Sequence, residues 1–134
     1  MDLDLKGKTI IITGGSGGIG QGLVMEFARE GCNVVSASRD AATGQKLAQE
    51  AKQQGLPGRV LAVATDVTQR ASVEAMIEKA NQQFGPIDGL VNNAGGVAHP
   101  AAFAELDEEA RRWEIALNID GVVNCCQAVA KDML

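Results

Sequence analysis

The sequence predicts an α/β fold in which a parallel sheet carries helices on both faces. Short and nearly continuous apolar runs alternate with stretches of helical periodicity along the chain. No linker rich in Pro, Gly or Ser and no internal repeat interrupts this alternation. Strands that are buried on both faces and joined by helices form parallel sheets with right-handed crossovers. We therefore expect residues 1–134 to form a single domain with the strand order 3-2-1-4.

The first strand and the first helix are expected on either side of a glycine cluster. Residues 8–13 form a β-branched run that predicts a strand, and the glycines that follow predict a tight turn. Gly31 stands where the helix after this turn would end, and residues 33–38 predict the second strand. These segments form a first βαβ unit. The apolar face of its helix is expected to contain Ile19, Leu23, Val24 and Phe27.

Two further helices alternate with two further strands in the middle of the chain. Asp40 is a candidate N-cap for a surface helix, and residues 59–64 predict the third strand. Thr68 is a candidate N-cap for the next helix, and residues 87–92 predict the fourth strand. The apolar face of this helix is expected to contain Val73, Met76, Ile77, Ala80 and Phe84.

The last segment is expected to form a long helix from an N-cap at Asp107 to Leu134, interrupted at Asn118 and Gly121. Apolar residues in this helix recur at spacings of three and four and form a narrow seam, which suits packing against another helix. The seam consists of Ile115, Ile119, Val122, Cys126, Val129 and Met133.

Composition and charge exclude several classes of function. The formal net charge is -5, and no run of Lys and Arg marks a surface for nucleic acid. No apolar stretch approaches the length of a membrane span, and residues 1–8 do not form a signal-peptide core. The three cysteines show neither a disulfide framework nor a metal-ligand spacing, and we interpret them as small buried hydrophobic residues. We expect a cytoplasmic protein without a bound metal.

The glycine turn after the first strand predicts a binding site for a dinucleotide. Such a turn presents free N–H groups and the positive end of a helix dipole to a pyrophosphate. Its position after a strand and within a βαβ unit is the context of the dinucleotide fingerprint in Rossmann-type doubly wound folds. The glycines fit two templates, and the local pattern does not distinguish them. These are Gly15-x-Gly17-x-x-Gly20 and Gly14-x-x-x-Gly18-x-Gly20.

Residues after the second and third strands predict how the adenosine is recognised. Folds of this kind bind a ribose 2′-hydroxyl with a carboxylate at the end of the second strand. This chain has Ser38 and Arg39 there, and a guanidinium can bind a 2′-phosphate. We therefore expect NADP rather than NAD, with a solvated loop charge as the alternative interpretation of Arg39. Asp66 has two interpretations, an acceptor for the adenine amino group or a charge that favours the following helix.

Four motifs, taken together, resemble those of the short-chain dehydrogenase/reductase family along the whole chain. They are Thr13-Gly14-x-x-x-Gly18-Ile19-Gly20, Asp66-Val67, Asn92-Asn93-Ala94-Gly95 and Asn118-x-x-Gly121. The resemblance selects the second glycine template and implies an oxidoreductase that interconverts carbonyl and alcohol groups. It also implies that Asn118 is an active-site residue whose backbone holds a water in a proton relay. The cofactor-binding residues that it implies are Gly14, Ser16, Gly18, Ile19, Gly20, Ser38, Arg39, Asp66, Val67, Asn93, Ala94 and Gly95.

The chain also departs from the pattern of this family. Gly17 stands where NADP-preferring members often have a basic residue, so the NADP prediction depends on Arg39 alone. The catalytic Ser and the Tyr-x-x-x-Lys motif of the family are missing, and the chain contains no Tyr. We therefore expect a truncated cofactor-binding portion of such an enzyme, inactive by itself. The alternative is a complete nucleotide-binding or self-associating module without catalysis.

The remaining features concern association and packing. Truncation would leave the fourth strand and the helix over residues 115–133 without part of their cover, so we expect a homo-oligomer through these surfaces. His99, the only histidine, is assigned no role. Arg111 and Arg112 are expected on a solvated helix face, and Trp113 is expected to anchor the long helix.

Overall fold

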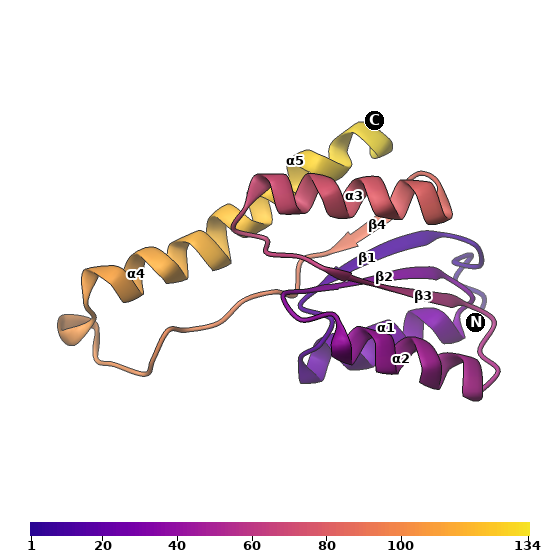
Figure 1. Ribbon diagram of the computed structural model, residues 1–134, viewed down its shortest axis with the longest axis horizontal. Helices are drawn as coiled ribbons and strands as arrows, with labels where there is room; N and C mark the ends of the chain where they lie inside the picture. The colour runs from indigo at the N-terminus through magenta and orange to yellow at the C-terminus, as the bar shows by residue number, and fades with distance from the viewer.

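The computed structural model describes residues 1–134 and contains a four-stranded parallel sheet with the order β3-β2-β1-β4. Helices α1 (Gly18–Arg29) and α2 (Ala42–Gln53) cover one face of the sheet. Helices α3 (Arg70–Phe84) and α5 (Gly121–Met133) cover the other face (Figure 1). The predicted fold class and strand order are therefore confirmed. The strands are β1 (Thr9–Thr13), β2 (Asn33–Ser38), β3 (Arg59–Ala64) and β4 (Gly89–Val91).

Each face of the sheet has its own hydrophobic core. Side chains alternate along β1, so Ile11 packs with the residues of α3 and α5, whereas Ile10 and Ile12 pack with those of α1 and α2. All three isoleucines are buried. Because both faces are covered, the strands are apolar at successive positions, as the sequence pattern predicts.

A long connection leads away from the sheet after β4 (Figure 1). It contains a 3₁₀ helix, η1 (Phe103–Glu105), and ends at helix α4 (Glu108–Ile115). A π-helical turn, η2 (Ala116–Asp120), joins α4 to α5. The helical segment therefore has nearly the predicted extent. The interruption predicted at Asn118 is confirmed, because this residue lies inside η2, whereas Gly121 is the first residue of α5.

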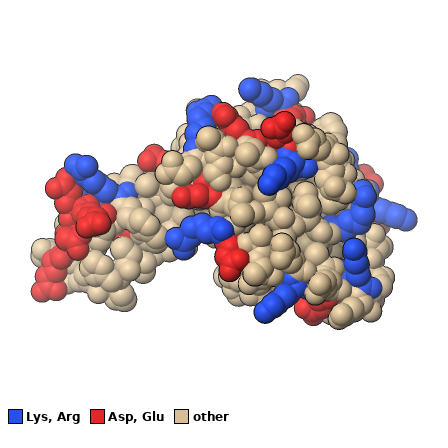
Figure 2. All heavy atoms as spheres, in the orientation of Figure 1, with Lys and Arg blue, Asp and Glu red and all other residues tan.

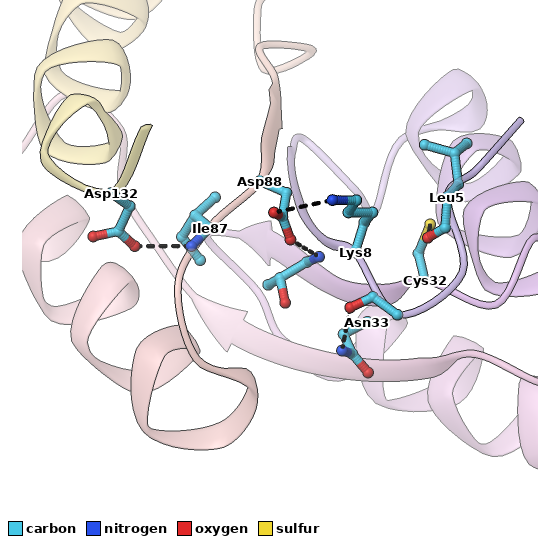
Figure 3. A network of polar contacts seen from close by, with 9 residues as sticks. Leu5, Lys8, Cys32, Asn33, Ile87, Asp88 and Asp132 are labelled. Atoms are coloured by element: carbon cyan, nitrogen blue, oxygen red, sulfur yellow. Dashed lines mark hydrogen bonds and ion pairs between the residues drawn. The ribbon is translucent and has the colours of Figure 1, made fainter. Parts of the chain in front are cut away.

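Polar side chains hold the amino-terminal ends of the central strands together (Figure 3). Asp88 Oδ2 accepts a hydrogen bond from Thr9 N at 2.8 Å, and Asp88 Oδ1 lies 3.8 Å from Lys8 Nζ. Asp132 Oδ2, on α5, accepts hydrogen bonds from Ile87 N at 2.9 Å and from the Asn81 side chain at 2.7 Å. These carboxylates connect the start of β4 to β1 on one side and to the helices on the other.

The helix starts agree with the predicted caps at one position of three. Asp107 caps α4, because its carboxylate accepts a hydrogen bond at 2.8 Å from the backbone N–H three residues later. Asp40 lies one residue before the N-cap of α2 and accepts a hydrogen bond from the N–H two residues later. Thr68 does not cap α3, because the helix starts at Arg70 with Gln69 at its N-cap position. The Thr68 N–H and hydroxyl donate to Asp66 Oδ1, at 3.0 and 2.7 Å.

The apolar seam predicted along the last helix is uncovered at most of its positions. Val129 is buried and Val122 is half-buried, whereas the remaining members are exposed. The buried positions of α5 instead follow a spacing of four: Gly121, Cys125 and Val129. A π-helical turn contains an extra residue, so the periodicity before η2 does not continue after it.

Two of the three cysteines are buried, as predicted, but Cys126 is exposed. Burial raises the pKa of Cys125 to about 11, and it also raises the pKa of Cys32. Both buried side chains therefore remain uncharged thiols at neutral pH.

The molecular surface shows no broad basic region on the face drawn in Figure 2. Acidic side chains gather over the end of the molecule that contains α4, and basic side chains are scattered over the rest of this face. Among the helices, none is both long enough and apolar enough to span a bilayer.

Candidate functional site

A cleft of about 630 Å³ opens at the carboxyl-terminal ends of the strands. Its walls come from the turn after β1, the ends of β2 and β3, the loop after β4, and the α4–η2 segment. The cleft brings together all of the residues predicted to bind a cofactor, among the 19 that line it. Ligands of open parallel sheets bind at this edge, where the strand order reverses, here between β1 and β4.

The glycines of the turn after β1 differ in their surroundings. Gly14 has a φ of +65°, and a Cβ on it would lie 2.9 Å from the Ala94 backbone. A Cβ on Gly20 would lie 2.1 Å from the carbonyl oxygen of Gly14. Gly18 lines the cleft, and a Cβ on it would meet no atom within 4 Å. Gly14 and Gly20 thus allow close packing, while Gly18 leaves open space where a ligand can approach the backbone.

Three backbone donors at the start of α1 have no acceptor within the chain. They are the N–H groups of Gly18, Ile19 and Gly20, which belong to the first turn of the helix. No acidic side chain lies in this turn. Free N–H groups at the positive end of a helix dipole favour an anion such as a phosphate.

Ile19 does not pack on the apolar face of α1, so that prediction is wrong. Its side chain is 77% exposed and lies at the cleft. The other predicted members of this face are confirmed: Val24 is buried, and Leu23 and Phe27 are half-buried against the same core. The buried positions of α1 are Gly20, Val24, Met25 and Ala28.

Two serines of β2 contact the glycine turn. Ser38 Oγ accepts a hydrogen bond from Ser16 N at 3.0 Å, and this contact holds the turn against the end of the strand. Ser36 lies under Gly15, on which a Cβ would come within 2.3 Å of the Ser36 hydroxyl. The Ser36 hydroxyl is buried and has no hydrogen-bond partner. Gly15 therefore serves the packing of the turn on β2.

The two charged side chains of the cleft differ in their partners. Arg39 follows β2, is exposed, and its guanidinium takes part in none of the ion pairs or hydrogen bonds of the chain. The Asp66 carboxylate, in contrast, already accepts two hydrogen bonds from Thr68 in the turn before α3. Arg39 is therefore free to bind an anion, and Asp66 also has a role in shaping its own turn.

Thr13, to which sequence reasoning assigned no separate role, connects the carboxyl-terminal ends of β1 and β4. Its Oγ1 accepts hydrogen bonds from Asn93 N at 3.1 Å and from Ala94 N at 3.0 Å. The Asn93 side chain in turn donates to Gly14 O at 3.1 Å. β4 consequently ends at Val91, before the predicted residue 92, and the loop after it is fixed against the glycine turn.

Asn118 lies beside the cleft and is not among the residues that line it. Its side-chain amide donates to Gly96 O at 2.8 Å and to Glu114 O at 2.9 Å, and its Oδ1 accepts from Gly96 N at 3.0 Å. A Cβ on Gly95 would lie 2.8 Å from this oxygen. The side chain thus braces the loop after β4 against η2. The relay role of its backbone stays a prediction.

The cleft also contains residues that sequence reasoning missed: Gly17, Ala37, Thr65, Thr68, Trp113, Ala116 and Leu117. Trp113 was expected to be a packing anchor, but it is 39% exposed and lines the cleft. No periodicity in the sequence could place it there, because its direction depends on how the irregular segment after α4 is wound.

A second cavity of about 360 Å³ lies on the other side of Trp113. His99 is part of its lining, and His99 Nε2 lies 3.7 Å from Asp107 Oδ2, so this histidine has a carboxylate neighbour that the sequence did not indicate. Arg111 and Arg112 are exposed and lie near Glu108, as predicted for a solvated helix face.

Comparison with known proteins finds similarity along almost the whole chain. The family model described as short chain dehydrogenase matches residues 8–134. Oxidoreductase UcpA of Salmonella typhimurium is 42% identical over 130 residues, which are 97% of this chain and 48% of that protein. The chain spans about half the length of the curated relatives that it matches.

The solved structures similar to this fold include two with a bound cofactor. A 3-ketoacyl-(acyl-carrier-protein) reductase from Brucella melitensis, complexed with NADH, has a TM-score of 0.86 and 34% identity over 96% of this chain and 51% of its own. A short chain dehydrogenase/reductase from Burkholderia phymatum, in complex with NAD, has a TM-score of 0.89 and 28% identity over 98% of this chain and 46% of its own. The sheet, the glycine turn and these matches agree, and the chain belongs to the short chain dehydrogenase family.

Proposed function

We propose that the cleft binds NADP(H) and that the chain is the cofactor-binding portion of an oxidoreductase that interconverts carbonyl and alcohol groups. The observation that carries the choice of cofactor is the free guanidinium of Arg39 at the end of β2. No carboxylate occupies positions 38 or 39, and the next one, Asp40, accepts a hydrogen bond from Ala42 N at the start of α2. The similar solved structures contain NADH and NAD, which makes NAD the competing cofactor.

The residues present fit a dinucleotide. The open position at Gly18 and the free N–H groups at the start of α1 would hold the pyrophosphate. Asp66 and Val67 would hold the adenine, and Asn93, Ala94 and Gly95 would support the central strand and the cofactor ribose. When bound, the nicotinamide supplies or accepts a hydride. The residues of this chain bind and orient it.

Catalysis requires more than these residues provide. The family resemblance implies a Tyr as the proton donor, and this chain contains no Tyr. Orientation of a nicotinamide without an acid omits most of the transition-state stabilisation. We therefore propose that the chain by itself does not turn over substrate. The absence of Tyr also favours a second candidate, a nucleotide-binding module without catalysis. An in-frame continuation of the gene that encodes Ser and Tyr-x-x-x-Lys would support the enzyme instead.

Calorimetric titration of the chain with NADPH and with NADH tests the cofactor. We expect NADPH to bind about tenfold more tightly than NADH, because charge-assisted hydrogen bonds to a phosphate are worth about 1.5–3 kcal/mol. Arg39→Ala is expected to abolish this preference by weakening NADPH alone. Lys52→Ala, which removes an exposed positive charge at the far end of α2, is the matched control and should keep the preference. Equal affinities in the unmodified chain would contradict the role of Arg39.

We also propose that the chain forms a homo-oligomer through the free edge of β4 or through the helix over residues 115–133. That helix exposes apolar side chains, namely Ile115, Ile119, Val123 and Met133. Sedimentation at tens of micromolar chain concentration tests this proposal, and a monomer at that concentration would contradict it.

A further inference from the structure

Trp113 is a large aromatic side chain at the cleft for which cofactor binding has so far supplied no role. It is the only Trp of the chain, which contains no Tyr. Its side chain forms part of the wall of the cleft and also part of the wall of the second cavity. An indole that is 39% exposed between two hollows keeps apolar surface in contact with water, and a flat ligand could cover that surface.

The neighbours of Trp113 indicate which end of the cleft it faces. Leu117, one helical turn further along, packs against the core cluster that contains Val67. Another turn along, a Cβ on Gly121 would lie 2.7 Å from Val67 Cγ2. The Trp113 ring itself reaches the loop after β4, since a Cβ on Gly96 would lie 3.9 Å from Trp113 Cη2. Trp113 thus extends outward the wall that begins at Val67, beside the end of β3.

The charges on the two sides of Trp113 differ. The second cavity is lined by Asp107, Glu109 and His99, and its carboxylates disfavour a phosphorylated ligand. The cleft contains Arg39 and the free N–H groups of α1, which favour such a ligand. A phosphorylated ligand is therefore expected in the cleft, and a planar group of such a ligand would contact the indole from the cleft side.

We infer that Trp113 packs against the adenine ring of the cofactor and closes the outer side of the adenine site. This inference rests on the proposed function, because it assumes a dinucleotide whose adenine lies at Asp66 and Val67. Nucleobases stack on aromatic side chains with a gain that corresponds to roughly five- to hundredfold in affinity. Trp113 is then a binding residue for the cofactor and also a fluorescent reporter of its adenine half.

Fluorescence of the unmodified chain tests the contact without any substitution. Adenosine 2′,5′-bisphosphate contains the adenine and the 2′-phosphate but no nicotinamide, and it should quench Trp113 emission at saturation. Nicotinamide mononucleotide, the other half of the cofactor, should leave the emission unchanged. Because the chain contains no other Trp, any change in emission reports on this one position.

Calorimetry with substituted chains provides the second readout. Trp113→Ala should weaken both NADPH and adenosine 2′,5′-bisphosphate about tenfold, and Trp113→Phe, which keeps a ring, should weaken them by less than about threefold. Phe103→Ala is the matched control. Phe103 is an exposed aromatic residue that lines neither the cleft nor the second cavity, so its removal should leave both affinities unchanged.

The outcomes separate this inference from the proposed function. If NADPH binds the unmodified chain but the bisphosphate causes no quenching and Trp113→Ala binds NADPH normally, the inference is overturned and the proposed function stands. If neither NADPH, NADH nor the bisphosphate binds the unmodified chain, both are overturned. Quenching by nicotinamide mononucleotide alone would place Trp113 at the opposite end of the cofactor and also overturn the inference.

Discussion

The two ends of the parallel sheet differ in what their polar groups bind. At the amino-terminal end, Asp88 and Asp132 accept hydrogen bonds from backbone N–H groups of Thr9 and Ile87. At the carboxyl-terminal end, the first N–H groups of α1 and the Arg39 guanidinium have no partner within the chain. Polar groups that pair internally stabilise the fold, whereas unpaired groups at a cleft remain available to a ligand. Substitutions at the first end should change stability, and many at the second end should change binding alone.

Gly20→Ala should have the largest effect of the substitutions. It lies at the carboxyl-terminal end of the sheet, but it should lower stability as well as binding. The added Cβ would lie 2.1 Å from Gly14 O, a backbone atom, so the turn and α1 must separate. We expect the free energy of unfolding in urea to fall by about 3 kcal/mol and NADPH binding to be lost. Gly22→Ala, in the same helix with no atom within 4 Å of its Cβ, should instead raise the free energy by about 0.5–1 kcal/mol. Equal stability of the two variants would show that the glycine turn is not closely packed.

Asp88→Ala tests the amino-terminal end. It leaves Thr9 N without its acceptor, and we expect the free energy of unfolding to fall by about 2 kcal/mol. NADPH affinity measured by calorimetry should stay unchanged, because the cleft lies at the opposite end of the strands. Asp2→Ala, in the exposed amino-terminal segment, should change stability by less than about 0.5 kcal/mol. A loss of NADPH affinity with stability retained would show that the two ends are coupled.

Gly18→Ala should weaken NADPH binding and leave stability almost unchanged, the reverse of Asp88→Ala. A Cβ at this position meets nothing within 4 Å in the chain but projects from a residue that lines the cleft. We expect the free energy of unfolding to stay within about 0.5 kcal/mol and NADPH affinity to fall about tenfold or more. Unfolding in urea and calorimetry on the same preparation give both values. Unchanged affinity would mean that the phosphates do not approach this part of the backbone.

Ser36→Ala should have the smallest effect. It removes a buried hydroxyl that has no hydrogen-bond partner, so we expect the free energy of unfolding to rise by less than about 1 kcal/mol. Ser38→Ala is the matched comparison, because it removes the acceptor of Ser16 N and should lower stability by about 1 kcal/mol. A clear loss of stability in Ser36→Ala would indicate that its hydroxyl binds a buried water.

The order of the strands and the position of the cleft could be predicted because they follow from local patterns. The apolar runs that became β1, β2 and β3 are bounded by turn residues, and right-handed crossovers then restrict the topology. Polar and glycine residues that follow successive strands, such as Arg39 and Asn93, must meet at one edge of a parallel sheet. Their meeting in one cleft follows from the strand order alone.

The features that could not be predicted depend on how segments are wound and capped. Ile19 is exposed because α1 starts at Gly18, and Cys126 is exposed because the turn η2 shifts the positions that face the core. A regular period of 3.6 residues predicts neither the start of α1 nor the turn. The bond between Thr13 and the loop after β4 joins residues 80 positions apart. Thr68 has the side chain of a good N-cap, but α3 starts one residue later, with Gln69 at the N-cap position, and the Thr68 hydroxyl donates to Asp66.

The turn η2 has a consequence for how one long helical segment serves two surfaces. A π-helical turn takes about five residues where an α-helix takes about four, so the positions that share one face are displaced by one residue after it. Trp113 and Leu117 at the cleft are therefore followed at intervals of four by the buried Gly121, Cys125 and Val129. Deleting one residue within Ala116–Asp120 would leave a continuous α-helix whose two parts keep their directions, whereas deleting two would turn them apart by about 100°.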